Sequence, residues 1–259
     1  MFVLVLAIVV ALVAYGLFIE PRRLNVARYQ EDLIPHPTTR MRFAFLSDFH
    51  AGGGIPEGWW ERVVLETNAL APDAIFLAGD FVVRHARDVN TLQPLKGLRA
   101  PQGIYFVLGN HDFLDRPQDI RAFLTGIGGI DLTNRTIQLR REGKEIDVQG
   151  LDDHWYGAPG QIARNGKISH ITIAHQPDVA LDLEEGKTDL VLAGHTHGGQ
   201  VRLPIIGSPW IPAKLRQQVG GGRTLFSGIP VIVSRGLGQE KWHPRFGARP
   251  EVVIVDVGV

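Results

Sequence analysis

The chain has 259 residues, of which 44% are hydrophobic, and it contains 30 glycines, 16 prolines and no cysteine. This length suits one sizeable domain or two small ones, and the lack of cysteine excludes disulfides, thiolate metal sites and a cysteine nucleophile. Lys+Arg and Asp+Glu both number 27, so the formal net charge is zero and no nucleic-acid partner is expected, because such binders need a strong basic field.

The first 19 residues form an uncharged apolar run, MFVLVLAIVVALVAYGLFI, which predicts a transmembrane helix. As a helix it would be about 28 Å long, close to the thickness of the hydrocarbon core. A cleaved signal peptide and a buried core helix are the alternatives, but the run lacks a preceding basic region and a clear cleavage site. The first cations after it are Arg22, Arg23 and Arg28. By the positive-inside tendency, we expect a single-pass protein of the cell inner membrane, with a membrane anchor at 1–20 and a cytoplasmic domain at 21–259.

Short apolar runs rich in β-branched and aromatic residues predict buried strands in the rest of the chain. Five of them are 43–46, 74–78, 104–108, 171–174 and 190–193. Between the first two, residues 56–72 show helical spacing between two prolines, so an α/β core is expected. Four further strands are predicted at 136–140, 145–150, 229–234 and 251–257. Few helical patterns separate these four, which favours a more antiparallel second sheet, and 204–222 is expected to be a long surface loop.

Aspartate, asparagine and histidine residues follow five of these strands directly. They are Asp48 and His50, Asp80, Asn110 with His111 and Asp112, His175, and His195 with His197. Ligands bind beyond the carboxyl ends of strands in α/β sheets, and imidazole and carboxylate groups suit divalent Zn, Mn or Fe. Each residue alone is more often a cap or a turn residue, but five clusters together favour two ions that share a carboxylate. Asp80 is the natural bridge, because it is the lone carboxylate in its turn.

Other histidines fall outside this pattern and are expected to be ordinary residues: His36, His85, His154, His170 and His243. Asp112 could simply cap a turn, although a carboxylate next to a catalytic histidine such as His111 commonly orients it. A pair of divalent ions can bind a phosphate and stabilise an in-line displacement.

The ordered blocks DFH, GD, GNHD, AH and GHTH resemble those of calcineurin-like metallophosphoesterases over about residues 42–200. The resemblance implies an α/β/β/α sandwich of four layers with two mixed central sheets, and a centre of two divalent metal ions. It implies that one ion is bound by Asp48, His50, Asp80 and His197. It implies that the other is bound by Asp80, Asn110, His175 and His195. His111 then matches the histidine that contacts the phosphate and protonates the leaving group, and Asp112 looks like its partner.

The segments SDFHAG, LGNHD and GHTHGGQ are similar to those of bacterial membrane-anchored phosphodiesterases. This similarity implies hydrolysis of a phosphodiester or pyrophosphate bond by a water that two metal ions activate. Some members of that branch resemble enzymes that split the nucleotide-lipid UDP-2,3-diacylglucosamine, which would suit an anchored enzyme of lipid metabolism. Trp59 and Trp60 are then either core residues or a wall near an acyl chain. Gln176 replaces an expected Asn, a change that should alter only the surroundings of the ligand next to it.

Two alternatives remain open. The pair His195 and His197 also occurs in metallo-hydrolases of amides and lactams, but Gly198–Gln200 follows it here in place of an Asp-His continuation. The other alternative is a membrane-tethered metal-binding envelope or scaffold protein without turnover.

Overall fold

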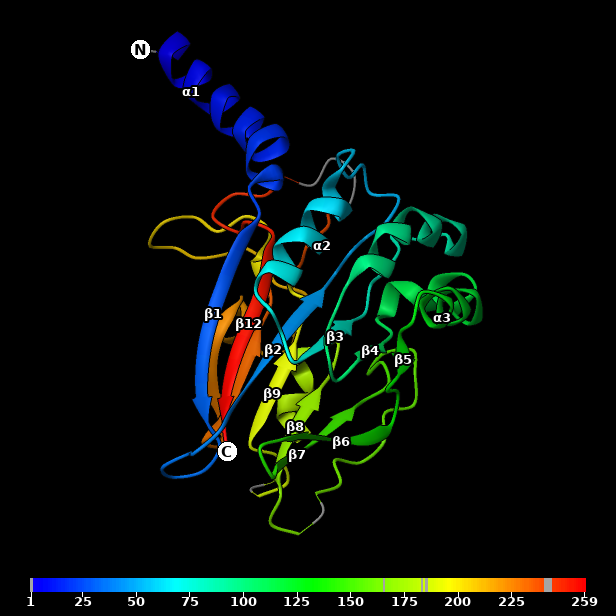
Figure 1. Ribbon diagram of the computed structural model, residues 1–259. Coiled ribbons are helices and arrows are strands. Elements are labelled where there is room, and N and C mark those ends of the chain that lie inside the picture. The colour runs from blue at the N-terminus through cyan, green and yellow to red at the C-terminus, as the bar shows by residue number, and fades with distance from the viewer. Residues whose placement is uncertain (1, 165, 183, 185, 240–243) are drawn as a thin grey trace.

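The computed structural model describes residues 2–164, 166–182, 184, 186–239 and 244–259. Two six-stranded sheets are packed face to face, and helices cover the outer face of the first sheet (Figure 1). The first sheet has the order β1 (Asn25–Asp32), β12 (Glu251–Gly258), β2 (Arg40–Ser47), β3 (Ala74–Ala78), β4 (Ile104–Val107) and β5 (Ile130–Asp131). The second has the order β10 (Gly222–Phe226), β11 (Ile229–Val233), β9 (Leu190–Ala193), β8 (Ser169–Ile173), β7 (Lys144–Gly150) and β6 (Arg135–Arg141).

Both sheets are mixed, as the sequence predicts. In the first sheet β2, β3, β4 and β5 are parallel, while β12 runs antiparallel to β2. In the second sheet β7, β8, β9 and β11 are parallel, and β6 and β10 are antiparallel edge strands. Two of the five strand pairings in the second sheet are antiparallel, against one of five in the first, so the expectation of a more antiparallel second sheet is confirmed. Its four central strands are nevertheless parallel, because loops and short 3-10 helices make the crossovers that helices make in the first half.

The core between the sheets explains why the strand segments are apolar on both faces. On β2, Phe43 and Phe45 point between the sheets, while Ala44 and Leu46 point toward the helices. The helical layer consists of α2 (Trp59–Ala69), α3 (Pro117–Gly126) and the 3-10 segment η3 (Ala86–Gly97). The outer face of the second sheet is covered by the 3-10 helices η5 (Pro177–Asp182) and η7 (Arg216–Val219) with their loops, which completes the four-layer α/β/β/α arrangement.

Trp59 and Trp60 at the start of α2 are buried in the helical layer. Their exposed fractions are 4% and 5%, and the Trp60 ring lies 5.7 Å from that of Phe49. They are core residues, so the idea that they form a wall near an acyl chain is wrong. A helix face that packs on a sheet needs large apolar side chains, and these two supply them.

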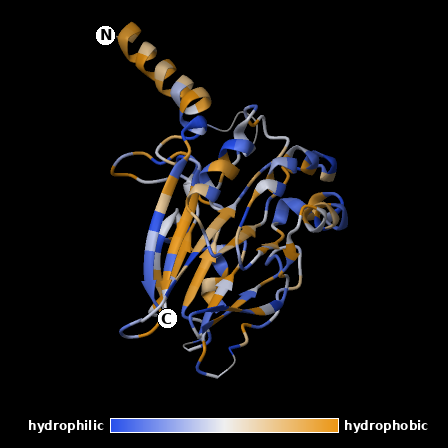
Figure 2. Ribbon diagram, in the orientation of Figure 1, coloured by the Kyte–Doolittle hydropathy of each residue, from blue (hydrophilic) through white to orange (hydrophobic). Residues whose placement is uncertain are grey.

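An apolar helix at the N-terminus stands away from the domain (Figures 1 and 2). It consists of α1 (Phe2–Ala14), a π turn, η1 (Tyr15–Ile19), and a short 3-10 turn, η2 (Glu20–Arg22). No residue of α1 is buried, which excludes a core helix. Among the described residues, Phe2–Arg22 is the one helix that is long and apolar enough to cross a membrane, and a signal sequence would look the same.

Candidate metal centre

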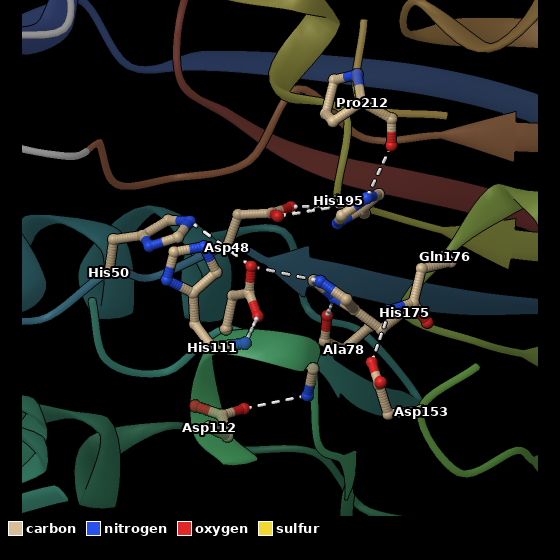
Figure 3. A network of polar contacts seen from close by, with 12 residues as sticks. Asp48, His50, Ala78, His111, Asp112, Asp153, His175, Gln176, His195 and Pro212 are labelled. Carbon is tan, nitrogen blue, oxygen red and sulfur yellow. Dashed lines mark hydrogen bonds and ion pairs between the residues drawn. The ribbon is translucent and has the colours of Figure 1, made fainter. Parts of the chain in front are cut away.

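Five strands from the two sheets direct their carboxyl ends to one place. β2 leads to Asp48 and His50, β3 to Asp80, β4 to Asn110 and His111, β8 to His175, and β9 to His195 and His197. Figure 3 shows side chains from both sheets pointing toward one another across this edge. The structure thus brings together all seven residues predicted to bind metal, as well as both residues predicted to be catalytic.

The backbone at this edge is in the left-handed conformation at five residues other than glycine. They are Asp48 (φ 55°), His50 (φ 47°), Asp80 (φ 53°), His195 (φ 70°) and His197 (φ 51°). Asp and His tolerate this conformation better than most residues, but it still carries strain, which folded proteins concentrate at functional sites. The turns also pack closely: a Cβ at Gly79 would lie 2.5 Å from the backbone nitrogen of Gly109.

One group of donor atoms comes from Asp48, His50, Asp80 and His197, and these atoms all lie within 4.8 Å of one another. The Nε2 atoms of His50 and His197 face each other at 2.9 Å. Burial lowers the pKa of His50 to about 3 and holds the pKa of His197 well below its ordinary value. Both rings are therefore neutral at pH 7, and a neutral imidazole nitrogen is the form that binds a metal ion.

A second group is formed by Asp80, His175 and His195, again within 4.8 Å, so Asp80 belongs to both groups. Nδ1 of His175 donates to the carbonyl of Ala78 at 2.8 Å, and Nε2 of His195 donates to the carbonyl of Pro212 at 2.7 Å. A carbonyl on one ring nitrogen fixes the tautomer and directs the other nitrogen to the centre, as around metal-bound histidines.

The pKa values of these two histidines differ. Burial lowers the pKa of His195 to about 3. Burial also acts against a charge on His175, but the adjacent Asp80 carboxylate outweighs it and raises the pKa of His175 to about 10. Nε2 of His175 lies 3.2 Å from Oδ2 of Asp80, so this nitrogen holds a proton that a metal ion bound beside Asp80 would displace.

The donor set fits divalent ions. Oδ1 of Asn110 is buried and accepts no hydrogen bond from the described residues, which is costly unless a cation or water approaches it. Asn110 lines the same cavity as His50 and Asp80. This oxygen, the carboxylates and the neutral imidazoles together form a mixed oxygen and nitrogen donor set. Such a set suits a hard or borderline divalent ion.

His111 lies on the cavity side of this centre. Its Nδ1 donates to the carbonyl of Val83 at 2.6 Å, and its ring stands perpendicular to that of His50 at 4.8 Å. Its backbone N–H donates to Oδ1 of Asp80 at 2.9 Å. The ring is thus held by a backbone carbonyl, and the centre and the catalytic candidate are tied to each other through Asp80.

The contacts of Asp112 are those of a turn cap, the alternative to a partner that orients His111. Its fully buried carboxylate accepts backbone N–H groups from Phe81 at 2.8 Å, Val82 at 3.3 Å and Gly109 at 2.9 Å. Asp112 therefore joins the turn after β3 to the turn after β4, and Val83 supplies the carbonyl that orients His111. Burial raises the pKa of Asp112 to about 7.

Residues around the centre that were not predicted come from distant loops. Gln176 donates to Asp153, whose other oxygen accepts the backbone N–H of Trp155 at 2.9 Å. The Trp155 ring then packs edge-on against His195 at 4.5 Å. Gln176 therefore contacts residues that surround the centre. The sequence around Asp153 and Trp155 contains no pattern that predicts this contact.

Arg245 is a second residue near the centre that the sequence does not predict. Its side chain is completely buried, with one guanidinium nitrogen 2.8 Å from the carbonyls of both Arg235 and Ala248. The other terminal nitrogen lies 3.3 Å from Nδ1 of His197.

Of the histidines expected to be ordinary, His36 and His85 are exposed, while His243 lies outside the described residues.

A cavity of about 700 Å³ opens above the centre. Its floor is polar and includes His50, Asp80 and His111, while Trp155 and Trp210 belong to its walls. An α/β sandwich with clustered carboxylate and imidazole donors under an open cavity is the arrangement of a metal-dependent phosphoesterase. Residues 41–199 match the model of the family described as calcineurin-like phosphoesterase, so the chain belongs to this family.

Relatives cover almost the whole chain. A metallophosphoesterase of Bacillus subtilis, YkuE, is 30% identical over 93% of this chain and 87% of its own length. The phosphodiesterase YaeI of Escherichia coli is 26% identical over 94% of this chain and 92% of its own length. Among solved structures, the NAD nucleotidase of Haemophilus influenzae matches with a TM-score of 0.51 at 16% identity, over 78% of this chain and 46% of that one, which supports the fold alone.

One relative bears on the N-terminal helix. A zebrafish protein described as a transmembrane protein with a metallophosphoesterase domain is 29% identical over 77% of this chain and 50% of its own length. The helix Phe2–Arg22 has the length and composition of such a span.

Proposed function

We propose that this protein hydrolyses a phosphodiester or pyrophosphate bond at a centre of two divalent metal ions, Mn, Zn or Fe. The observation that carries the proposal is that two groups of donor atoms share Asp80 at the floor of an open cavity. A single ion would use the donor atoms of only one of these groups. Membership of the calcineurin-like family and a relative described as a phosphodiesterase support the same chemistry.

Each ion would be held by four residues, and Asp80 would belong to both sets. One set is Asp48, His50, Asp80 and His197, and the other is Asp80, Asn110, His175 and His195. When bound, such ions withdraw charge from the phosphoryl oxygens and lower the pKa of a water. The strained turns hold the donors in place before the ions arrive, so little reorganisation is needed.

His111 acts as the general acid. The carbonyl of Val83 takes the proton on Nδ1, which makes Nε2 the nitrogen that gains or loses a proton during turnover. His111 lines the cavity beside Asp80 and Asn110, so its ring borders the place that a phosphoryl group would occupy. It protonates the oxygen of the leaving group, while Asp112 positions the turns that carry Asp80 and Val83.

The substrate is a nucleotide-lipid with a pyrophosphate bond, such as UDP-2,3-diacylglucosamine, or another lipid-linked phosphodiester. A polar floor with tryptophan and proline walls suits a phosphate joined to an apolar group. In this proposal the chain is a single-pass protein of the cell inner membrane, with residues 1–20 as the anchor and the domain 21–259 on the cytoplasmic side. The exposed apolar surface of α1, followed by Arg22 and Arg23, supports this placement.

The test uses the full chain in detergent, loaded with Mn or Zn. Cleavage of bis-p-nitrophenyl phosphate and of UDP-2,3-diacylglucosamine is measured with and without a chelator. We expect metal-dependent cleavage, loss of both bound ions in Asp80→Asn, and a strong fall of kcat with both ions retained in His111→Ala. The control is His36→Asn, because His36 is exposed, lies outside the centre and has a φ of 55° that Asn tolerates.

Three results would count against the proposal. If two ions bind but no diester or pyrophosphate is cleaved, a tethered metal-binding protein without turnover becomes the better description. Unchanged turnover in His111→Ala would remove this histidine from the mechanism. Cleavage of the synthetic diester alone would keep the chemistry and exclude UDP-2,3-diacylglucosamine as the substrate.

A further inference from the structure

An apolar hairpin, residues 203–207, projects from the domain near the base of α1 (Figure 1). Leu203 pairs with Gly207, and the turn between them carries Ile205, which is fully exposed, and Ile206, which is 74% exposed. Ile205 has a φ of 70°, an unfavourable conformation for a β-branched residue. Two adjacent isoleucines displayed at a tip are unfavourable in water. We propose that this hairpin inserts into the surface of the bilayer that α1 enters, so that the mouth of the cavity faces the lipid headgroups.

The helix is docked on the domain, which fixes how the domain meets a bilayer. The backbone N–H of Arg245 donates to the carbonyl of Gly16 at 2.9 Å, and the rings of Tyr15 and Phe246 make an edge contact at 6.1 Å. A Cβ at Gly16 would lie only 3.1 Å from the carbonyl oxygen of Arg245, so glycine permits this approach. Because the π turn is held by these contacts, α1 is not a loose tether.

The hairpin is connected to this docking point by backbone hydrogen bonds. The N–H of Phe246 donates to the carbonyl of Gln200 at 2.8 Å, and the N–H of Arg202 donates to the carbonyl of Phe246 at 2.6 Å. Phe246 is therefore paired on one side with residues 200–202, which lead into the hairpin, and touches Tyr15 of η1 on the other. Figure 2 shows the loop coloured as hydrophobic at the end of the domain from which α1 leaves.

The apolar surface of the loop continues into the cavity. Val201, Pro209 and Trp210 come from the same loop and line the cavity above Asp80 and His111. Trp210 is 71% exposed, and tryptophan is favoured at the level of the headgroups. A lipid lying in the bilayer surface can thus reach the centre along an apolar path. This conclusion about the substrate rests on the proposed hydrolysis, whereas insertion of the hairpin rests only on the proposed membrane anchor.

Exposed arginines at the same end favour a bilayer surface over an apolar protein partner. Arg22 and Arg23 follow the helix, and Arg202 precedes the hairpin. An apolar tip flanked by cations is the pattern of an element that enters the surface of an anionic membrane. A partner protein with an apolar groove is the alternative that the experiment must exclude.

The absence of cysteine in the chain allows a site-specific test. The variant Ile205→Cys is labelled with the polarity-sensitive dye NBD, and the full chain is reconstituted in vesicles of phosphatidylethanolamine and phosphatidylglycerol. The matched control is Lys144→Cys, because Lys144 is exposed at the start of β7, opposite the strand ends that carry the centre. We expect a blue shift of the emission and quenching by shallow brominated lipids at position 205, and neither effect at position 144.

A label at position 205 that stays as hydrated as the one at position 144 would overturn the proposal, because α1 alone would then hold the protein on the membrane. A blue shift without quenching by brominated lipids would also overturn it, since a protein contact would then shield the tip. Both readouts need no turnover, so they stand whether or not the proposed hydrolysis is correct.

A second variant tests the link to the substrate. Ile205→Ser/Ile206→Ser changes only the exposed tip, which does not line the cavity. We expect cleavage of soluble bis-p-nitrophenyl phosphate to stay unchanged, and cleavage of UDP-2,3-diacylglucosamine in vesicles to fall by about tenfold, because two side chains no longer enter the apolar layer. If the variant cleaves both substrates at the rates of the wild type, the apolar path is refuted. Absence of any cleavage by the wild type would refute the proposed function and leave the result of the labelling intact.

Discussion

Gly109 is the residue at which the packing of the centre can be tested with a single methyl group. Its φ and ψ of −114° and 175° suit alanine, so the substitution Gly109→Ala strains no dihedral angle. The added Cβ would lie 2.5 Å from both the backbone nitrogen and Oδ1 of Asp80, and 2.8 Å from Cδ2 of His175. The methyl group therefore collides with the shared carboxylate and with one of its histidine neighbours.

The size of the effect follows from these distances. Non-bonded carbon contacts are relaxed at about 3.5 Å, so the two turns must separate by about 1 Å. A displacement of about 1 Å at a reacting centre can lower the rate by about 100-fold, and overpacking in a rigid region destabilises by about 1–3 kcal/mol. We expect both effects in Gly109→Ala, because Asp80 serves both groups of donors.

The assay measures kcat/KM for bis-p-nitrophenyl phosphate, the number of bound ions by mass spectrometry and the Tm. The matched control is Gly126→Ala at the end of α3, where an added Cβ meets nothing within 4 Å. This control should keep full activity and gain up to about 1 kcal/mol of stability. Wild-type metal content and kcat/KM in Gly109→Ala would refute the idea that close packing of these turns positions the centre.

Two further predictions concern stability. Arg245→Met leaves the carbonyls of Arg235 and Ala248 without their buried donor, so the protein should lose about 3 kcal/mol of stability and its Tm should fall by roughly 6–12 °C. The control is Arg249→Met, a substitution of an exposed neighbour. Equal Tm values for the two variants would contradict the role of Arg245. Burial lowers the pKa of His170 below 6.5, so stability is retained above pH 6.5 and falls as the pH drops toward the folded pKa. The Tm of the wild type should therefore fall more between pH 7.5 and pH 5 than that of His170→Gln, and parallel curves would exclude this histidine as a source of acid sensitivity.

Most of the strands that the sequence predicts are buried on both faces, and the exposed edge strand β6 is the exception. β3 and β12 are continuous apolar segments because helices or loops cover one face and the other sheet covers the opposite face. β1, NVARYQED, was missed because it is an edge strand with alternating exposed polar residues. The sequence also does not predict β10 or α3. β10 contains a glycine and alternates in exposure. α3 is short and carries its apolar residues only at Ile120, Phe123 and Leu124.

The candidate ligands could be recognised because each directly follows a strand, so their convergence is a consequence of the sheet topology. The supporting contacts could not be recognised in the same way. The carbonyls of Val83 and Pro212 are backbone groups, which any residue type could supply. Arg245 and Trp210 reach the centre from loops that are far away along the chain, and nothing local to them indicates which loop meets which strand. Their roles depend on three-dimensional packing alone.

The position of β12 has a consequence for the order of folding. This strand lies between β1 and β2, so the first sheet has a gap until residues 251–258 have been synthesised. Before that point β1 and β2 both present open edges, which can pair with other chains. Contacts between residues so distant in the chain also form slowly. A nascent chain held by α1 at a membrane would wait for its final strand while kept apart from other copies, and this separation would protect those open edges from aggregation.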